Sequence, residues 1–265
     1  DDEVVGEAAR ELYADARKML AQLVAGKWLT ARAVFGFFPA NRVGDDDVAI
    51  YADEQRSGPV AMLHHLRQQK PLADKLPNAC LADFVAPHDS GLRDYVGAFV
   101  VTAGLGIEPH VAAFERALDD YSAILLKALA DRLAEACAEY LHAEVRRVHW
   151  GYAAEEKLTG DQLVAEGYRG IRPAPGYPAC PDHTEKATLW KLLDVERHIG
   201  VQLTESFVMM PAASVSGFYY AHQSSRYFAV GRIGRDQVEE YARRKGMSLT
   251  TAERWLSSNL AYDPE

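Results

Sequence analysis

Cysteine is scarce in this chain, and its arrangement argues against a disulfide framework. The 265 residues include three cysteines, Cys80, Cys137 and Cys180, which are odd in number, widely spaced and without a C-x-x-C pair. A disulfide-stapled domain or a cysteine zinc site would need cysteines that are paired and closely spaced. The thiols therefore indicate a reducing compartment, and we expect a cytoplasmic location.

Long apolar runs and an excess of positive charge are also missing. No stretch approaches the length of a membrane span, and Asp1-Asp2-Glu3 lacks the basic and apolar regions of a signal peptide. The formal net charge is −9, which argues against nucleic acid as a partner because phosphate binding depends on clustered Lys and Arg. The one basic run, Arg243-Arg244-Lys245, is expected to be the solvated end of a helix, where cations suit the helix dipole.

Motifs of common enzyme sites are absent or incomplete. The nine histidines contain no H-E-x-x-H, so we expect no metal site. The segment 102–109, TAGLGIEP, lies between a strand-like and a helical run, but proline replaces the third glycine of a dinucleotide loop. It is therefore interpreted as a turn and a helix start. Ser214 and Ser216 lack the G-x-S-x-G frame of a nucleophile elbow and are expected on a strand.

The residues that are present describe an ordinary globular chain. Apolar residues make up 48% of the sequence and charged residues 25%, which is enough to bury a core. Apolar side chains three or four apart predict helices at 3–27, 60–69, 108–149, 182–198, 235–245 and 250–257. Branched and aromatic runs predict strands at 33–38, 48–51, 95–101, 203–209, 215–221 and 226–233. The range 108–149 is too long for an average helix and should contain a break. This order predicts the α+β class, a single domain with a largely antiparallel twisted β-sheet flanked by helices.

The most informative segment is 172–183, RPAPGYPACPDH, which no core strand or helix could use. Its four prolines remove backbone donors and hold the chain extended, so we expect a rigid, shaped loop. Arg172 enters the loop, and a glycine relieves the turn beside Tyr177. Exposed peptide groups, one guanidinium and one ring could together grip a small ligand.

Other residues are ambiguous when only the local pattern is considered. Glu135 lies at the boundary of a helical apolar stripe and is expected to be solvated. Tyr227 and Phe228 are expected on a strand, where they would point to opposite faces. His183 either begins a helix beside Asp182 or contacts a partner or cofactor.

The proline-rich loop is part of a longer distinctive string, YRGIRPAPGYPACPDHTEKATLW, at residues 168–190. Further strings are LADFVAP at 81–87, ESF at 205–207, ASVSG at 213–217, RYFAV at 226–230 and RDQVEEYARRKG at 235–246. Together they resemble the C-terminal activation domain of cobalamin-dependent methionine synthase, and the resemblance covers essentially the whole chain. Because the sequence opens without Met in a helical pattern, we expect residues 1–265 to be an S-adenosylmethionine-binding activation domain cut from a larger multidomain chain, without the N-terminal part of the domain.

This resemblance implies a module for reductive reactivation, working within a methyltransferase. Domains of the family bind S-adenosylmethionine and present its methyl group to cobalamin, which a neighbouring domain of the same polypeptide holds. After the cobalamin has been oxidised during turnover, flavodoxin or another reductase returns an electron, and methylation restores methylcobalamin for methionine biosynthesis. The implied partners are therefore the cobalamin-binding domain and the reductase.

The family contacts to S-adenosylmethionine transfer to six positions: Glu135, Arg172, Ala174, Tyr177, Tyr227 and Phe228. The resemblance assigns the ligand carboxylate to Arg172 and its ammonium to Glu135. No catalytic side chain is expected, because methyl transfer to cobalt is an in-line displacement for which the domain supplies positioning. A further acidic contact of the family lies upstream of residue 1, so we expect weaker binding by this fragment.

Two alternatives stay open. The chain could be a docking module for the cobalamin domain and reductase that does not bind the methyl donor, or an unrelated enzyme with a pocket at the same loop. It contains no cobalamin-ligating motif, homocysteine zinc site or folate domain, so we do not expect it to form methionine alone. If the donor-binding interpretation holds, the loop faces the corrin, with Tyr177 and His183 near that interface.

Overall fold

The structure is a computed structural model that describes residues 2–69 and 77–264. Its α-helices are α1 (Asp2–Gly26), α2 (Glu108–Arg116), α3 (Asp120–Glu144), α4 (Gly160–Val164), α5 (Glu185–Leu193), α6 (Val195–Ile199), α7 (Arg235–Lys245) and α8 (Leu249–Trp255). Its strands are β1 (Thr30–Val43), β2 (Asp47–Tyr51), β3 (Pro59–His64), β4 (Asp94–Leu105), β5 (Gln202–Leu203), β6 (Met209–Met210) and β7 (Ser214–Tyr219). Within these described ranges, no helix has the length and apolar character needed to cross a membrane.

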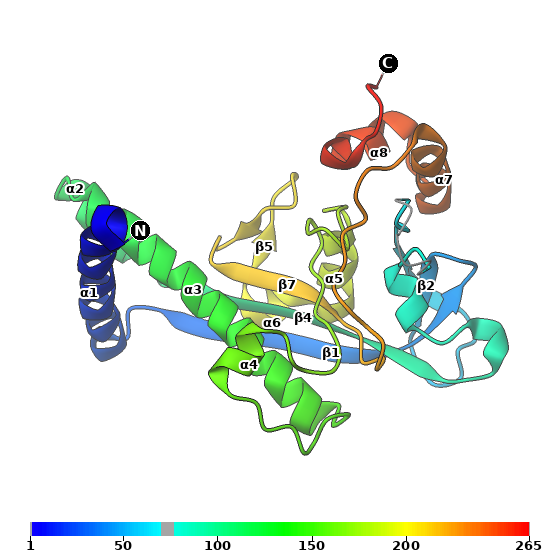
Figure 1. The fold of residues 1–265 in the computed structure, drawn as a ribbon, viewed down its shortest axis with the longest axis horizontal. Coiled ribbons are helices and arrows are strands. Elements are labelled where there is room, and N and C mark those ends of the chain that lie inside the picture. The colour runs from blue at the N-terminus through cyan, green and yellow to red at the C-terminus, as the bar shows by residue number, and fades with distance from the viewer. Residues whose placement is uncertain (1, 70–76, 265) are drawn as a thin grey trace. The chain divides into compact units, whose positions relative to one another are not determined.

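Five strands form the main sheet, in the order β3-β2-β1-β4-β7 (Figure 1). The pairing of β1 with β2 is antiparallel, as is that of β2 with β3. The short strands β5 and β6 form a separate antiparallel pair. The predicted α+β class with a largely antiparallel sheet is therefore confirmed.

The chain divides into two compact units, each made of three segments. The first unit comprises Asp1–Ala33, Val101–Leu141 and Ile199–Val215, and the second comprises Val34–Val100, His142–His198 and Ser216–Glu265. In the first unit α1 packs on α2 and α3, and the buried residues are Met19, Leu23, Val111, Ala123, Leu125 and Leu126. The ring of Trp28 stacks on that of His110 with centroids 4.5 Å apart. The apolar faces of these amphipathic helices thus form the core of the first unit.

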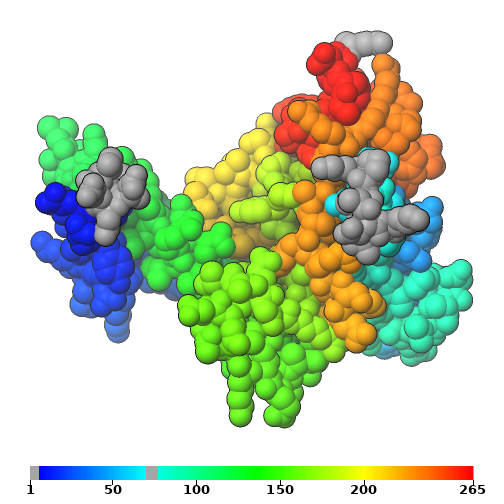
Figure 2. All heavy atoms as spheres, viewed as in Figure 1, coloured from blue at the N-terminus to red at the C-terminus, as the bar shows by residue number. Residues whose placement is uncertain are grey.

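The second unit contains β2, β3, the proline-rich loop and the C-terminal helices. Helices α7 and α8, orange to red, gather in one cluster at the upper right of Figure 2. Their buried core includes Leu66, Val230, Ile233, Val238, Tyr241, Ala242, Ala252, Leu256 and Leu260. This cluster packs the end of the chain near the loop that precedes α5, because Val230 donates a backbone hydrogen bond to the Pro178 carbonyl at 2.9 Å.

The expected break in the long helical range 108–149 is present. α2 ends at Arg116 and α3 begins at Asp120, with Leu118 between them in a left-handed conformation, φ 56°. The glycine segment 102–109 is a turn and a helix start, since β4 ends at Leu105 and α2 begins at Glu108. Helix α7 has the predicted bounds.

The predicted helix at 60–69 is wrong. Residues Pro59–His64 form β3, which pairs with β2 so that Leu63 lies opposite Val48. Val60, Leu63 and Leu66 recur three apart and therefore imitate a helical stripe. Helix propensity differs by only fractions of a kcal/mol among such residues, so pairing with a neighbouring strand decides.

Two further predicted strands are wrong. The range 203–209 is mostly the turn that joins β5 to β6, closed by a hydrogen bond from Thr204 N–H to the Val208 carbonyl at 2.9 Å. The range 226–233 is not one of the strands. Val230 N–H donates to the Pro178 carbonyl of the proline-rich loop and Ile233 N–H to the Asn259 carbonyl, both at 2.9 Å. The prediction that Tyr227 and Phe228 lie on a strand and point to its opposite faces is therefore wrong.

The prediction that the basic run at the end of α7 is solvated is wrong for two of its three residues. Arg243 keeps a side chain that is 75% exposed, but those of Arg244 and Lys245 are 13% and 12% exposed. Arg244 pairs with Asp47, and Lys245 pairs with Asp182 and Glu185. The acidic partners come from distant segments, which local reading of the helix does not reveal.

Candidate functional site

The proline-rich loop is fastened to β7 at its entry. Ile171 and Tyr220 exchange two backbone hydrogen bonds of 3.0 and 3.1 Å, and Phe218 N–H donates to the Pro173 carbonyl at 3.0 Å. At Gly217 a Cβ atom would lie 2.7 Å from the same Pro173 oxygen, so only glycine allows this approach. The start of the loop is therefore held by the main chain, whatever its side chains do.

The middle of the loop folds into a compact bend with its own hydrogen bonds. Tyr177 N–H donates to the Ala174 carbonyl at 3.1 Å, and Cys180 N–H to the Tyr177 carbonyl at 2.9 Å. Gly176 N–H donates back to Cys180 at 2.7 Å, with φ 94° in the region that favours glycine. This confirms a shaped loop. The Tyr177 ring is 60% exposed, and Ala174 is partly buried.

The end of the loop is buried and polar. The Asp182 carboxylate, 2% exposed as a residue, accepts hydrogen bonds from Thr184 N–H and Thr184 Oγ1, both at 2.8 Å, just before α5 begins. Tyr241 Oη and Lys245 Nζ also reach Asp182 Oδ2, each at 2.6 Å. Although burial alone would raise it, the charge of Lys245 and these hydrogen bonds hold the pKa of Asp182 below its usual value.

His183 lies where the loop meets α5. Its ring packs against Gly176, at which a Cβ atom would come 2.2 Å from the imidazole. His183 Nδ1 lies 3.1 Å from Lys186 Nζ, and its pKa is lowered by partial burial and by that ammonium. His183 lies in the turn before α5, whose N-cap is Thr184, so it precedes the helix and does not begin it. A contact of His183 with a partner or cofactor stays a prediction.

The Arg172 guanidinium is oriented by aromatic neighbours. Arg172 Nη1 donates to Tyr168 Oη at 2.9 Å and lies 3.2 Å from His142 Nδ1. The guanidinium carbon lies 5.9 Å from the centre of the Tyr168 ring. Because arginine only donates, His142 Nδ1 accepts this hydrogen bond.

His142 itself is fully buried and neutral. Its ring stacks on Tyr219 with centroids 5.1 Å apart and an angle of 17°. Burial, with smaller effects of the charges on Arg146 and Arg172, lowers the pKa of His142 to about 2. The imidazole therefore remains an acceptor across the physiological range of pH.

Tyr168 is held in turn by a buried ion pair. The guanidinium carbon of Arg146 lies 4.2 Å from the Tyr168 ring centre, and Arg146 forms a forked contact with Glu156 at 2.7 to 3.0 Å. Sequence reasoning missed His142, which lies in the last turn of α3, and Arg146, which lies in the π-helical turn Val145–His149 that follows it. Tyr168 stands in the string that carries the resemblance, and that was the only signal for it.

The two aromatic candidates from 227–228 are placed differently. Tyr227 Oη accepts a 2.9 Å hydrogen bond from the Arg172 backbone N–H, so it lies at the entry of the loop. Phe228 packs against the C-terminal core, and its ring lies 6.4 Å from that of Phe84 in the LADF string. The second unit thus brings Tyr227 to Arg172, whereas Phe228 is partly buried against the C-terminal core.

Glu135 lies on α3 in the first unit, where its side chain is exposed, as the boundary interpretation predicted. The other five candidates, Arg172, Ala174, Tyr177, Tyr227 and Phe228, belong to the second unit. The assignment of Glu135 to a ligand ammonium stays a prediction.

A cleft of about 440 Å³ opens beside the loop in the second unit. Tyr177 and His183 line it together with Arg254, Trp255 and Asn259. Its size falls in the range of small-molecule sites. Across the described residues, no three His, Cys, Asp or Glu side chains are grouped to hold a metal ion.

Comparison with known proteins agrees with the geometry. A family model described as "Vitamin B12 dependent methionine synthase, activation domain" matches residues 1–246. A solved structure titled "Crystal Structure of the MetH Reactivation Domain bound to AdoHcy" superposes with a TM-score of 0.94 at 60% sequence identity. The match covers 99% of this chain and 80% of that chain.

Proposed function

The chain belongs to the family of activation domains of vitamin B12-dependent methionine synthase, a methyltransferase, and we propose that it binds S-adenosylmethionine for reductive reactivation of cobalamin. One observation carries the proposal. The similar structure, 60% identical over 99% of this chain, is by its title bound to AdoHcy, the demethylated form of that donor. The loop that holds Arg172 in this chain is intact and shaped.

The residues present fit the chemistry of the proposed ligand. S-adenosylmethionine has an amino-acid end with two charges, a sulfonium and an adenine. The planar Arg172 guanidinium, oriented through Nη1 by His142 and Tyr168, suits the carboxylate. Glu135 is assigned to the ammonium, and its exposure leaves the carboxylate accessible.

The remaining candidates supply peptide groups and rings. Ala174 contributes backbone polar groups where proline prevents sheet pairing. Tyr177, Tyr227 and Phe228 supply aromatic surface for the rest of the ligand. The Tyr227 hydroxyl also accepts a hydrogen bond from the Arg172 backbone N–H, so the aromatic candidate and the guanidinium candidate are joined directly.

The role of these side chains is to hold and aim the donor. Bound S-adenosylmethionine supplies an electrophilic methyl group on a positively charged sulfur. The loop must leave the sulfonium accessible to the cobalt, and the 60% exposure of Tyr177 supports an open surface there. No side chain is asked to act as nucleophile or base.

The proposed partners follow from the same role. Cobalamin is held by a neighbouring cobalamin-binding domain of the same polypeptide, and flavodoxin or an equivalent reductase supplies the electron. We expect the isolated chain to turn over nothing by itself. The three cysteines are free thiols, which supports the expected reducing, cytoplasmic setting.

Calorimetric titration of the purified chain tests donor binding directly. Saturable heat is expected with S-adenosylmethionine and with S-adenosylhomocysteine, in a sample whose circular dichroism shows that it is folded. A folded sample that gives neither heat nor a thermal shift up to millimolar ligand would favour the docking module that does not bind the donor.

A further inference from the structure

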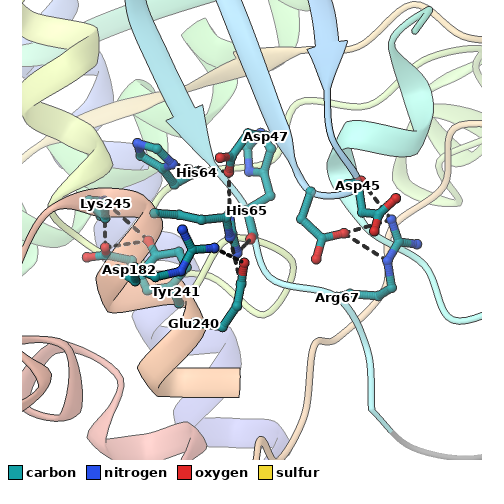
Figure 3. A network of polar contacts seen from close by, with 12 residues as sticks. Asp45, Asp47, His64, His65, Arg67, Asp182, Glu240, Tyr241 and Lys245 are labelled. Atoms are coloured by element: carbon teal, nitrogen blue, oxygen red, sulfur yellow. Dashed lines mark hydrogen bonds and ion pairs between the residues drawn. The ribbon is translucent and has the colours of Figure 1, made fainter. Parts of the chain in front are cut away.

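The C-terminal end of α7 carries a buried charge cluster that faces the end of the proline-rich loop. Figure 3 shows Lys245, Tyr241 and Asp182 turned toward one another. Lys245 Nζ lies 2.6 Å from Asp182 Oδ2 and 2.5 Å from Glu185 Oε1. The side chains of Asp182 and Glu185 are 3% and 1% exposed, so these are interior contacts.

Asp182 is the loop's own residue in this cluster, whereas Glu185 belongs to α5. The loop bend closes on itself through the hydrogen bonds among Ala174, Gly176, Tyr177 and Cys180. It is tied to β7 at its start and to Val230 at the Pro178 carbonyl, so an anchor at its far end would complete the definition of its direction. Asp182, bonded to α7 by Lys245 and Tyr241, is placed to be that anchor.

We propose that Asp182, through its ion pair with Lys245 and its hydrogen bond from Tyr241, positions the loop that carries Arg172, Ala174 and Tyr177 for the methyl donor. The inference rests on the proposed function. It makes Asp182, Tyr241 and Lys245 positioning residues, since none is assigned a contact with the ligand.

The energetics favour orientation over simple stabilisation. Removing a carboxylate and an ammonium from water is unfavourable, and a well-packed apolar replacement is often as stable. A buried pair with defined hydrogen-bond geometry instead selects one arrangement of the segments that it joins. The pair is intact at neutral pH: the charges of Glu185 and Asp182 outweigh the effect of burial and raise the pKa of Lys245.

A matched pair of variants separates positioning from stability. Asp182→Asn and Glu185→Gln each remove one buried negative charge that faces Lys245, with almost no change of shape. The asparagine oxygen can still accept from Thr184 N–H, so the start of α5 is retained. Positioning through the loop predicts about a ten-fold loss of S-adenosylmethionine affinity in Asp182→Asn and less than about a two-fold loss in Glu185→Gln.

Affinity is measured by calorimetry at a temperature where all variants are folded, and melting temperatures are recorded separately. Wild-type affinity in Asp182→Asn would overturn the proposal. So would equal losses in the two variants that follow their melting temperatures.

Hydrogen exchange gives a readout that does not need the ligand. The amides of Gly176, Tyr177 and Cys180 are bonded inside the loop, and faster exchange is expected there in Asp182→Asn but not in Glu185→Gln. If the wild type binds no donor, the proposed function fails, and this comparison still decides whether Asp182 orders the loop. Unchanged exchange of these amides in Asp182→Asn would refute the inference.

Discussion

Acidification from pH 7 to pH 5 should destabilise the second unit by about 4 kcal/mol, through two buried imidazoles. His142 stacks on Tyr219 and is 0% exposed, and His65 is 2% exposed with Nε2 2.9 Å from Tyr220 Oη. Burial is the main reason that the pKa of His142 is lowered to about 2 and that of His65 to about 3. Both rings are therefore neutral in the folded protein over this range.

The sign follows from the direction of these shifts. An unfolded histidine has a pKa of about 6.5, so below that pH the unfolded chain binds a proton that the folded chain refuses. The stabilisation is complete above pH 6.5 and is lost as the pH falls toward the folded pKa values. Each pH unit costs about 1.4 kcal/mol per histidine, or about 2 kcal/mol each at pH 5.

The Asp182 and Glu185 carboxylates have opposed effects on stability as the pH falls. The pKa of Asp182 is lowered, so its stabilisation is lost mainly below about pH 4. Burial raises the pKa of Glu185, and a carboxyl of this kind gains stability as the pH falls. The loss of stability between pH 7 and pH 5 is therefore expected to come from the histidines.

Urea unfolding at pH 7, 6 and 5, followed by tryptophan fluorescence, measures this slope. His142→Phe and His65→Phe keep an aromatic ring and should each remove about half of the pH dependence. A free energy of unfolding that stays level from pH 7 to pH 5 would refute the reasoning. Full slopes in both phenylalanine variants would refute it equally.

Four further outcomes are expected. Arg172→Ala should lose about 2 kcal/mol of S-adenosylmethionine binding in calorimetry, and Arg172→Lys should recover part of it; normal binding by both folded variants would show that the carboxylate assignment is wrong. The chain alone should form no methionine from homocysteine and methyltetrahydrofolate, yet support reactivation when joined to a cobalamin-bearing module; methionine formation without that module would contradict this. Tyr177→Phe should leave the melting temperature nearly unchanged and alter reactivation in that joined protein, so unaltered reactivation would count against a loop that faces the corrin. Gly176→Ala should destabilise the fold by about 1 to 3 kcal/mol in urea unfolding, because its φ is positive and its Cβ would meet His183; an unchanged midpoint would mean that the bend can relax.

Local chemistry was enough to predict several parts of this protein. The prolines of 172–183 forbid regular structure wherever the segment lies, and the loop was expected for that reason. Apolar residues three or four apart gave α7 its predicted bounds. The resemblance of the strings around the loop supplied the family, which the comparisons confirm.

Local patterns failed where a distant partner decided the outcome. Val60, Leu63 and Leu66 have helical spacing, but β2 captures this segment as a strand. In the strand-like range 226–233, Val230 and Ile233 donate instead to the distant carbonyls of Pro178 and Asn259. In both cases the competing conformations differ little in intrinsic energy, so pairing across the fold selects one.

The loop, the helical periodicities and the family could be predicted from the sequence, because each depends on residues near one another in the chain or on a distinctive string. Which groups hold the candidate site became evident in the folded chain. His142 meets Arg172 across 30 residues, Tyr227 across 55, and Lys245 meets Asp182 across 63. Such pairs leave no periodic trace in the sequence, since their energy arises only when the folded chain excludes water and brings the partners within hydrogen-bond distance.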